Sequence, residues 1–461
     1  MNLETRTVLL PIRETIAEET IPLAFTTQKR RWKALNLGRM NILCEFCNAK
    51  HWFNERTAGS TTTRSIFEQC CKKGAVQLPL LLPPPDLLQS LMKSQDSMGR
   101  IFRSKIREYN SALSFTSVKY QADTRTANWG QGVQCFQIHG ELYHLQGPLE
   151  PAPHALPQFA QLFLYDPQYA ASIRFTSNPD LDSNLLQQLT LMLHECNPFI
   201  NIYQTAKERL DNANNNQADG ITRILLNPQL QLIVETGADK RRCNLPTSNE
   251  IAMIIGDEYA DSGFRDIVLA SRSDDNRPHF STINGNHALY MPLHYVLFFP
   301  RGESGYHWAL QLQDNSGQRK NTRLAQRAFY RYRLHPRNGE SDILFCGQRL
   351  WQQYLVDAWA VCDQNKLQWL RHHQANLRSD LYNGLADAMV RDEINAAAIG
   401  RRTILPSSYT GGDRFMQQLF QDSMAIVRHF GRPTLFITFT ANPKWEEMLQ
   451  SLSPSGNTCS R

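Results

Sequence analysis

The residues of this sequence that could hold a metal ion are concentrated in one short segment. It contains Cys44-x-x-Cys47, then His51, then the adjacent pair Cys70-Cys71. A Cys-x-x-Cys pair places two thiolates on one tight turn, which suits half of a tetrahedral zinc site, and a second pair can close it. The spacing predicts a structural zinc ion on Cys44, Cys47 and Cys70, with Cys71 or His51 as the fourth ligand.

Two other interpretations of these cysteines compete with the zinc site. The first is two incidental cysteine pairs in a small apolar cluster. The second is a thioredoxin-like redox pair, which is disfavoured because no βαβ pattern surrounds Cys44 and Cys47. A segment of about 40 residues is too short to bury a core of its own, so a metal ion would explain how it folds.

A second stretch has the composition of a nucleic-acid-binding surface. Residues 319–337 contain seven Lys and Arg and no acid. Four of the arginines recur every fourth residue, so a helix would place them in one row, and a row of guanidinium groups can follow a phosphate backbone while nearby rings stack on bases. The alternative is a solvated helix face with acidic partners elsewhere. The candidate nucleic-acid residues are Arg319, Lys320, Arg323, Arg327, Tyr330, Arg331, Arg333 and Arg337.

Composition and charge restrict the class of protein. The chain has 461 residues, 41% of them hydrophobic, and a net charge of +6. This composition is globular and excludes a wholly disordered chain. From Gln318 onward Lys and Arg outnumber Asp and Glu by seven, so a polyanionic partner such as DNA is expected in this part. Ten mostly scattered cysteines favour a reducing compartment, and neither a signal peptide nor a membrane-spanning segment is predicted.

The sequence predicts a multidomain α+β protein. A flexible N-terminal arm (1–40) precedes a zinc-finger-like module (41–78) and an extended proline-rich linker. A mixed α+β region (86–318) is followed by a basic helical region (319–400) and by a last region (401–461) with an amphipathic helix and an apolar strand.

Local patterns predict the elements that position these residues. Asp86 should begin a helix, and Leu181–Cys196 and the residues after Pro198 carry apolar stripes of helical period. Phe415–Phe430 predicts an amphipathic helix with Phe415, Leu419, Met424 and Val427 facing inward. Predicted strands, mostly antiparallel, are Ala112–Ser117, Val133–Ile138, Ile221–Leu226, Gln231–Glu235, Ile251–Ile255, Asp266–Ala270, Tyr306–Leu312 and Thr434–Thr440.

Several signatures of catalysis do not occur in the 461 residues. There is no G-x-x-x-x-G-K-[ST] phosphate loop, no pair of histidines separated by one residue and no H-E-x-x-H. No catalytic residue is therefore assigned, and no nucleotide site is predicted.

The motifs taken together resemble the Helitron-type rolling-circle transposases, in the region called the Helitron helicase-like domain. Cys44–Ala49 with Cys70–Gly74 looks like the family's zinc-finger-like motif, and Phe102–Ser117 looks like its IR-x-YN-x-A segment. Its later signatures are similar to Arg265–Val268, Pro292–Glu303, Arg349–Ala358, Leu405–Tyr409 and Phe436–Trp445. The order and number of these stretches make the resemblance specific.

The resemblance implies a protein of rolling-circle DNA transposition, located in the nucleus, with single-stranded DNA or a transposon end as its partner. In this family the strand that resembles Thr434–Thr440 opens a replication-initiator (Rep) endonuclease, and a 5′–3′ DNA helicase follows it. The resemblance therefore implies that residues 401–461 are the start of an incomplete Rep-like sheet domain, and the chain is expected to be truncated before the catalytic residues of both enzymes and inactive alone. It is predicted to be a DNA-binding and scaffolding part. The alternatives are a component of a nuclease or helicase completed by another polypeptide, and a non-functional transposon remnant.

Overall fold

The computed structural model describes residues 37–61, 64–122, 138–215, 221–226, 232–236, 267–269, 281–313, 322–374 and 404–435. Within them, helices are combined with small antiparallel sheets, which confirms the predicted α+β class. No described helix is both long and apolar enough to cross a bilayer. The predicted strand Ile251–Ile255, most of the predicted strands Val133–Ile138 and Thr434–Thr440, most of the N-terminal arm and all of 436–461 lie outside the described residues.

The cysteine segment folds around a two-stranded hairpin. Strands β1 (Ile42–Leu43) and β2 (Lys50–His51) pair antiparallel, with Ile42 opposite His51. The following stretch, Pro79–Pro85, was predicted to be a linker, and it lies against the later part of the chain. The amide of Ser341 donates to the carbonyl of Leu81, and the Arg301 guanidinium donates to the carbonyl of Pro83. The cysteine segment is thereby held against the rest of the protein.

In the described residues between Asp86 and Ile283, six α-helices and two three-stranded sheets build the middle of the chain. The helix predicted at Asp86 is present and starts after Pro85, and the apolar stripe of Leu181–Cys196 becomes a helix capped by the Asp182 carboxylate. The sheets have the strand orders β3-β4-β8 and β6-β5-β7, with all pairs antiparallel. The helices are α1 (Asp86–Lys93), α2 (Ser97–Ser104), α3 (Ile106–Leu113), α4 (Pro167–Ser177), α5 (Ser183–Cys196) and α6 (Pro198–Asn215), and the strands are β3 (Ser117–Ala122), β4 (Ile138–Gln146), β5 (Ile221–Leu226), β6 (Leu232–Thr236), β7 (Ile267–Leu269) and β8 (Ser281–Ile283).

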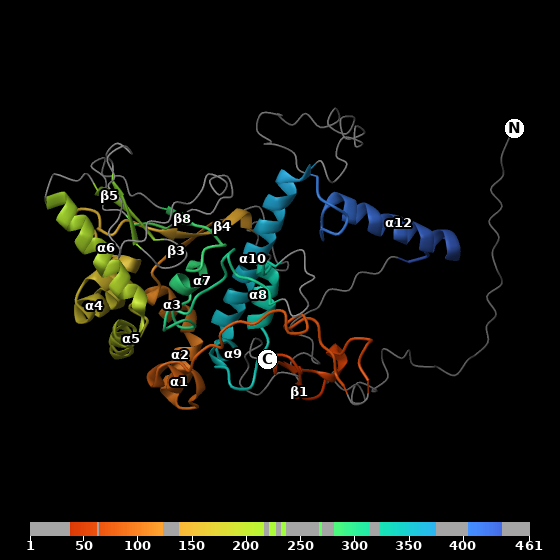
Figure 1. Cartoon of the computed structure of the whole chain (residues 1–461), viewed down its shortest axis with the longest axis horizontal. Coiled ribbons are helices and arrows are strands. Elements are labelled where there is room, and N and C mark those ends of the chain that lie inside the picture. The colour runs from red at the N-terminus through yellow and green to blue at the C-terminus, as the bar shows by residue number, and fades with distance from the viewer. Residues whose placement is uncertain are drawn as a thin grey trace, which may run out of the picture.

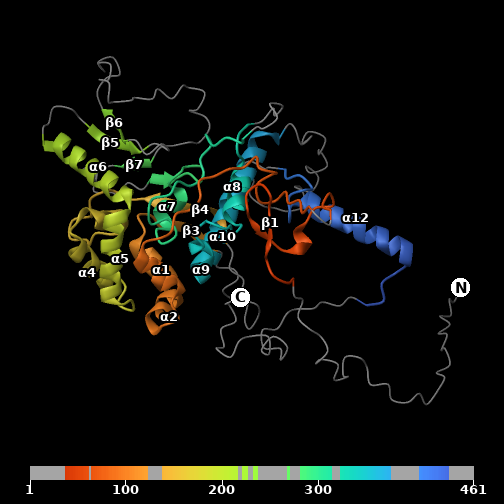
Figure 2. The ribbon, with the colours of Figure 1, turned by 60° about the horizontal axis from the view of Figure 1, so that its bottom comes forward.

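Helix α10 (Gln348–His372) crosses the centre of the molecule (Figure 1). It is preceded by α8 (Gln326–Arg333) and the short α9 (Ile343–Cys346), and it contacts α3, β4, α8 and α9. Its buried stripe of Leu350, Tyr354, Ala358 and Val361 repeats at helical spacing and therefore faces one core. Helix α12 (Asp413–Phe430) projects away from the body in both views (Figures 1 and 2).

The segment from Ala288 to Phe299, which includes α7 (Tyr290–His294), is buried throughout at the centre of this core. The side chain of Asn110 on α3 donates to the carbonyl of His294 at 2.8 Å, and its oxygen accepts from the amide of Leu297 at 3.4 Å. Buried residues from the cysteine segment, the middle region and α8–α10 form one continuous hydrophobic core.

Several local predictions were wrong. The run Ala112–Ser117 was predicted to be a strand, but α3 continues to Leu113 because Tyr109 and Leu113 complete its buried helical face. Tyr306–Leu312 is not a strand; among its described residues only Gln311 makes an isolated bridge.

The amphipathic helix at Phe415–Phe430 is present as α12, yet none of its residues is buried, so the predicted inward face has no described partner. Amphipathic spacing fixes which residues share a face, and it does not fix what that face packs against.

Candidate metal centre and adjoining basic surface

Two tight turns carry the four cysteines of the candidate metal centre. Cys44 and Cys47 lie in the loop of the β1–β2 hairpin, where Asn48 adopts a positive φ of 55° and its amide donates to the carbonyl of Cys44. In the second turn Lys72, Lys73 and Gly74 all have positive φ, and the amide of Gly74 donates to the Cys71 sulfur at 3.3 Å. Both turns bend the chain so that sulfurs and amides point inward.

The four sulfurs lie within 4.8 Å of one another. The Sγ atom of Cys71 is 3.8 Å from that of Cys44 and 3.9 Å from that of Cys70, and all four thiols are free. Zinc–sulfur bonds of about 2.3 Å in a tetrahedron place the sulfurs about 3.8 Å apart, whereas a disulfide needs about 2.05 Å. The arrangement fits a tetrahedral thiolate site for a soft ion such as zinc.

His51 lies beside this group and is not part of it. Its ring stacks on Phe67 with centroids 3.9 Å apart, and its Nδ1 is 2.8 Å from a carboxylate oxygen of Glu55. The sequence left the fourth position open between Cys71 and His51. The structure brings Cys71 into the group and gives His51 other partners.

The sulfurs perturb one another because they are close and partly dehydrated. Hydrogen bonds from Cys47, Cys70 and Cys71 lower the pKa of Cys44. Cys44 raises the pKa of Cys47, but hydrogen bonds from Cys70 and Cys71 outweigh this effect and lower the pKa of Cys47 to about 7. The same sulfur contacts raise the pKa of Cys70 and of Cys71. Anionic sulfur is the form that binds a metal ion, so Cys44 and Cys47 are the thiols that ionise most readily, and a bound cation would favour ionisation of the other two.

A buried arginine lies against the sulfur group. Arg337 is 5% exposed, and its Nη2 is 3.9 Å from the Cys47 sulfur. The Arg337 guanidinium also donates to the Tyr332 carbonyl and packs over the Tyr332 ring at 3.5 Å. A cation at this position stabilises thiolate charge, as outer contacts do in metal sites.

This burial corrects part of the predicted nucleic-acid surface. Arg333 is 6% exposed and donates to Glu340 at 3.0 Å and to the carbonyl of Pro79 at 2.7 Å. Tyr330 is 4% exposed and packs edge-to-face against Phe329. Arg333, Arg337 and Tyr330 therefore hold the interior together and do not face a phosphate backbone. The acid that pairs with both arginines, Glu340, lies just beyond the acid-free stretch.

The rest of the predicted row is shorter than expected. Arg319 and Lys320 lie outside the described residues, and α8 begins only at Gln326, so Arg323 precedes the helix. Arg327 is exposed and Arg331, one turn later on α8, is half-buried. These two residues and the exposed Arg323 are the members of the row that reach the described surface.

One surface residue that the sequence did not single out is Trp359. It is 67% exposed on α10, and the guanidinium carbon of Arg327 lies 5.8 Å from its ring centre. Helical spacing could have identified it as exposed, because Trp359 does not lie on the buried face of α10 that carries Leu350, Tyr354 and Val361.

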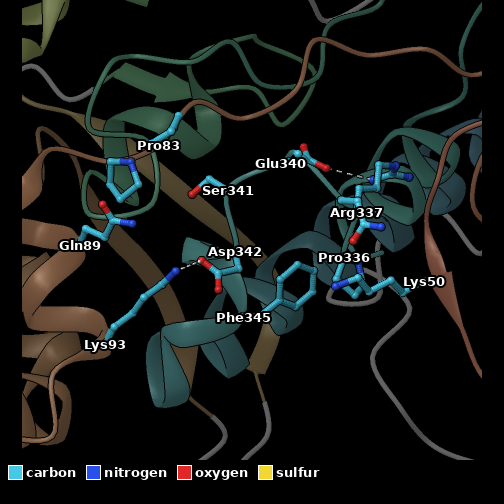
Figure 3. Close-up of a pocket in the computed structure, with 13 residues that line it drawn as sticks. Lys50, Pro83, Gln89, Lys93, Pro336, Arg337, Glu340, Ser341, Asp342 and Phe345 are labelled. Atoms are coloured by element: carbon cyan, nitrogen blue, oxygen red, sulfur yellow. Dashed lines mark hydrogen bonds and ion pairs between the residues drawn. The ribbon is translucent and has the colours of Figure 1, made fainter. Parts of the chain in front are cut away.

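A cavity of about 370 Å³ lies where the cysteine segment, the proline-rich stretch, α1 and α9 meet (Figure 3). Its charged side chains are mostly paired with each other. Lys93 lies 2.8 Å from Asp342, and Arg337 lies 3.3 Å from Glu340. These pairs join the segments around the cavity, and we assign it no ligand.

Comparison with known proteins locates a family in the C-terminal part of the chain. Residues 329–461 match the family described as the Helitron helicase-like domain at the N-terminus. The match begins within α8 and includes α9, α10 and α12. It therefore contains Arg337 and Asp357, while the four cysteines lie outside it. No curated protein matches the chain.

Proposed function

With a Helitron helicase-like N-terminal domain in residues 329–461, we propose that this chain is a DNA-binding and scaffolding part of a Helitron-type transposase. It acts in rolling-circle DNA transposition in the nucleus, and a zinc ion holds its cysteine segment. The observation that carries the proposal is the family match. Arg337, near the start of the matched residues, contacts the Cys47 sulfur and so joins the matched domain to the cysteine group.

The proposed zinc ion has a structural role. Cys44, Cys47, Cys70 and Cys71 would hold it, and zinc would supply free energy for folding a segment of about 40 residues, which is too short to bury a core of its own. A site with four protein ligands leaves no position open for a substrate, which is typical of structural zinc. The ordered segment then supports the α8 end of the matched domain through the pairing of Ala49 with Arg337.

The scaffolding role is supported by buried contacts between the matched domain and the residues before it. Asp357 in α10 accepts hydrogen bonds from His144 in β4 at 2.8 Å and from Tyr290 in α7 at 2.9 Å. A buried carboxylate needs such partners, so the matched segment depends on upstream residues for its core. We therefore propose that the two parts act as one unit.

DNA binding is supported by charge. The basic excess of the chain lies after Gln318, and Arg323, Arg327 and Arg331 reach the described surface there. Contacts of this kind release counterions from DNA, so binding should weaken steeply as salt rises.

Two measurements on the whole chain test the proposal. Purified protein should contain about one zinc ion per chain, and zinc should be lost from Cys44→Ser. Mobility-shift assays with single strands and duplexes carrying transposon-end sequences should show salt-sensitive binding. Absence of binding at low ionic strength, or binding that does not change with salt, would contradict the DNA-binding role. Manganese-dependent nicking or ATP hydrolysis by the purified chain would contradict the non-catalytic role.

A further inference from the structure

The turn that carries Cys70 and Cys71 and the helix α8 meet in a small basic groove. The groove has a volume of about 310 Å³, and its lining includes Lys72, Lys73, Ala328 and Arg331. Figures 1 and 2 both show the cysteine segment beside α8. The two sequence motifs, far apart along the chain, thus form one surface.

The charge of this groove is only partly neutralised. Lys73 pairs with Glu68 at 2.8 Å, and both side chains are more than half exposed. Lys72 is exposed and Arg331 is half-buried. Partial burial lowers the pKa of Arg331, and so does the neighbouring cation Arg327. An anion in the groove would relieve the repulsion between Arg331 and Arg327, and it would lie beside the cations of Lys72 and Arg331.

The basic surface continues from the groove along α8. Arg327 is one helical turn before Arg331, which corresponds to about 6 Å along the axis. Arg327 lies over the exposed ring of Trp359, and the adjacent Val356 is 63% exposed. Before the helix, Arg323 lies 5.5 Å from the ring centre of Trp308. Arg323 and Arg327 thus each lie beside a large ring, and Arg331 follows one turn after Arg327 at the groove. We call this set of cations and rings the track.

We propose that this track binds single-stranded DNA, with phosphates on Lys72 and Arg331 and an unpaired base stacked on Trp359 beside Arg327. This inference rests on the proposed DNA-binding function and names the form of DNA that this surface takes. It also gives the turn of Cys70 and Cys71 a second role, because the metal-bound turn would hold Lys72 at the groove.

The chemistry of the track favours a single strand over a duplex. In a duplex the faces of the bases are covered by their neighbours, and only base edges are accessible in the grooves. The ring of Trp359 is two-thirds exposed and lies beside the guanidinium group of Arg327. An unpaired base can stack on this flat apolar ring. Stacking of this kind depends little on base identity, so thymidine oligonucleotides are suitable probes.

Fluorescence anisotropy with a single-stranded thymidine oligonucleotide and with a blunt duplex tests the assignment on the whole chain. Trp359→Ala should weaken binding of the single strand by about tenfold, and Trp359→Phe should restore most of it. Lys72→Ala and Arg331→Ala should each reduce the slope of log K against log salt by about 0.7, the value for one phosphate of a single strand.

Two variants serve as matched controls. Trp369→Ala removes another exposed tryptophan of α10, which follows Trp359 by ten residues and stacks on His373, and it should leave binding unchanged. Arg107→Ala removes an exposed cation of α3 and should leave the salt slope unchanged.

The outcomes separate this inference from the proposed function. If the wild type binds both oligonucleotides and Trp359→Ala binds the single strand as tightly as the wild type, the stacking site is wrong and DNA binding stands. Equal affinity of the wild type for the duplex and the single strand would also overturn the inference. If the wild type binds neither oligonucleotide, both proposals fail.

Discussion

Replacement of Asp357 should destabilise the centre of the protein more than any surface change. Its carboxylate is 3% exposed and accepts three hydrogen bonds, from His144 at 2.8 Å, Tyr290 at 2.9 Å and Tyr295 at 3.1 Å. Both ring nitrogens of His144 face acceptors, since Nδ1 is 2.9 Å from the Tyr290 carbonyl. The Asp357 carboxylate and the imidazole lie at ion-pair distance, and two hydroxyl groups also donate to the carboxylate.

The magnitude follows from these contacts. Removing one partner of a buried ion pair costs about 3–5 kcal/mol, because the other charge is left without compensation. Asp357→Ala also leaves two buried hydroxyl groups without their acceptor, so we expect a loss of about 4 kcal/mol. Asp357→Asn keeps the volume and one acceptor oxygen, and a neutral His144 can accept from its amide. We expect this variant to lose about 2 kcal/mol.

Urea unfolding followed by tryptophan fluorescence measures both losses. The urea concentration at the midpoint of unfolding should fall. The slope of the free energy of unfolding against urea concentration should stay the same, because the surface exposed on unfolding does not change. Asp422→Ala is the matched control, since Asp422 is exposed on α12 and its removal should change stability by less than about 0.5 kcal/mol. A loss of less than about 1 kcal/mol for Asp357→Ala would refute the buried ion pair.

The pH dependence gives an independent check. Burial raises the pKa of Asp357, but the charge and hydrogen bond of His144 outweigh burial, so the pKa in the folded protein lies below its usual value. The stabilisation is therefore complete above the unfolded pKa of about 4 and is lost as the pH falls through the folded value. Asp357→Asn should be less sensitive to acid than the wild type over this range. Equal acid sensitivity of the two proteins would contradict the assignment.

Two further predictions concern the metal centre. Cys71→Ser should lose the metal while His51→Ala keeps it, as measured by chelator-released zinc, because only Cys71 lies within the sulfur group; retention of zinc by Cys71→Ser would reject the four-cysteine site. Arg337→Ala should weaken zinc binding by about 10- to 100-fold and Arg337→Lys by less, because the cation beside the Cys47 sulfur is lost in the first and retained in the second. Competition with a chromophoric chelator measures both affinities, and equal affinities of the wild type and Arg337→Ala would exclude a role for Arg337 at the site.

Features that depend only on local spacing could be predicted from the order of the amino acids. The turn at Cys44-x-x-Cys47 brings two sulfurs together whatever the rest of the chain does, so a cysteine cluster was predictable. Helical spacing of apolar residues likewise located α5 and α12, and short runs rich in Ile, Val and Leu, bounded by turn residues, located β5 and β7. The ordered motifs predicted the Helitron helicase-like domain, which the family match confirms for residues 329–461.

Which of the basic residues face solvent could not be predicted from spacing, because it depends on contacts between distant parts of the chain. Arg327 and Arg333 belong to the same acid-free stretch, yet Arg333 is buried against Glu340 and Arg327 lies on the surface. The choice between Cys71 and His51 also depended on long-range packing, because Phe67 and Glu55 hold the imidazole away from the sulfurs. Spacing along a chain fixes the face on which a side chain lies, but its burial depends on segments that are distant in sequence, and these meet only in the folded protein.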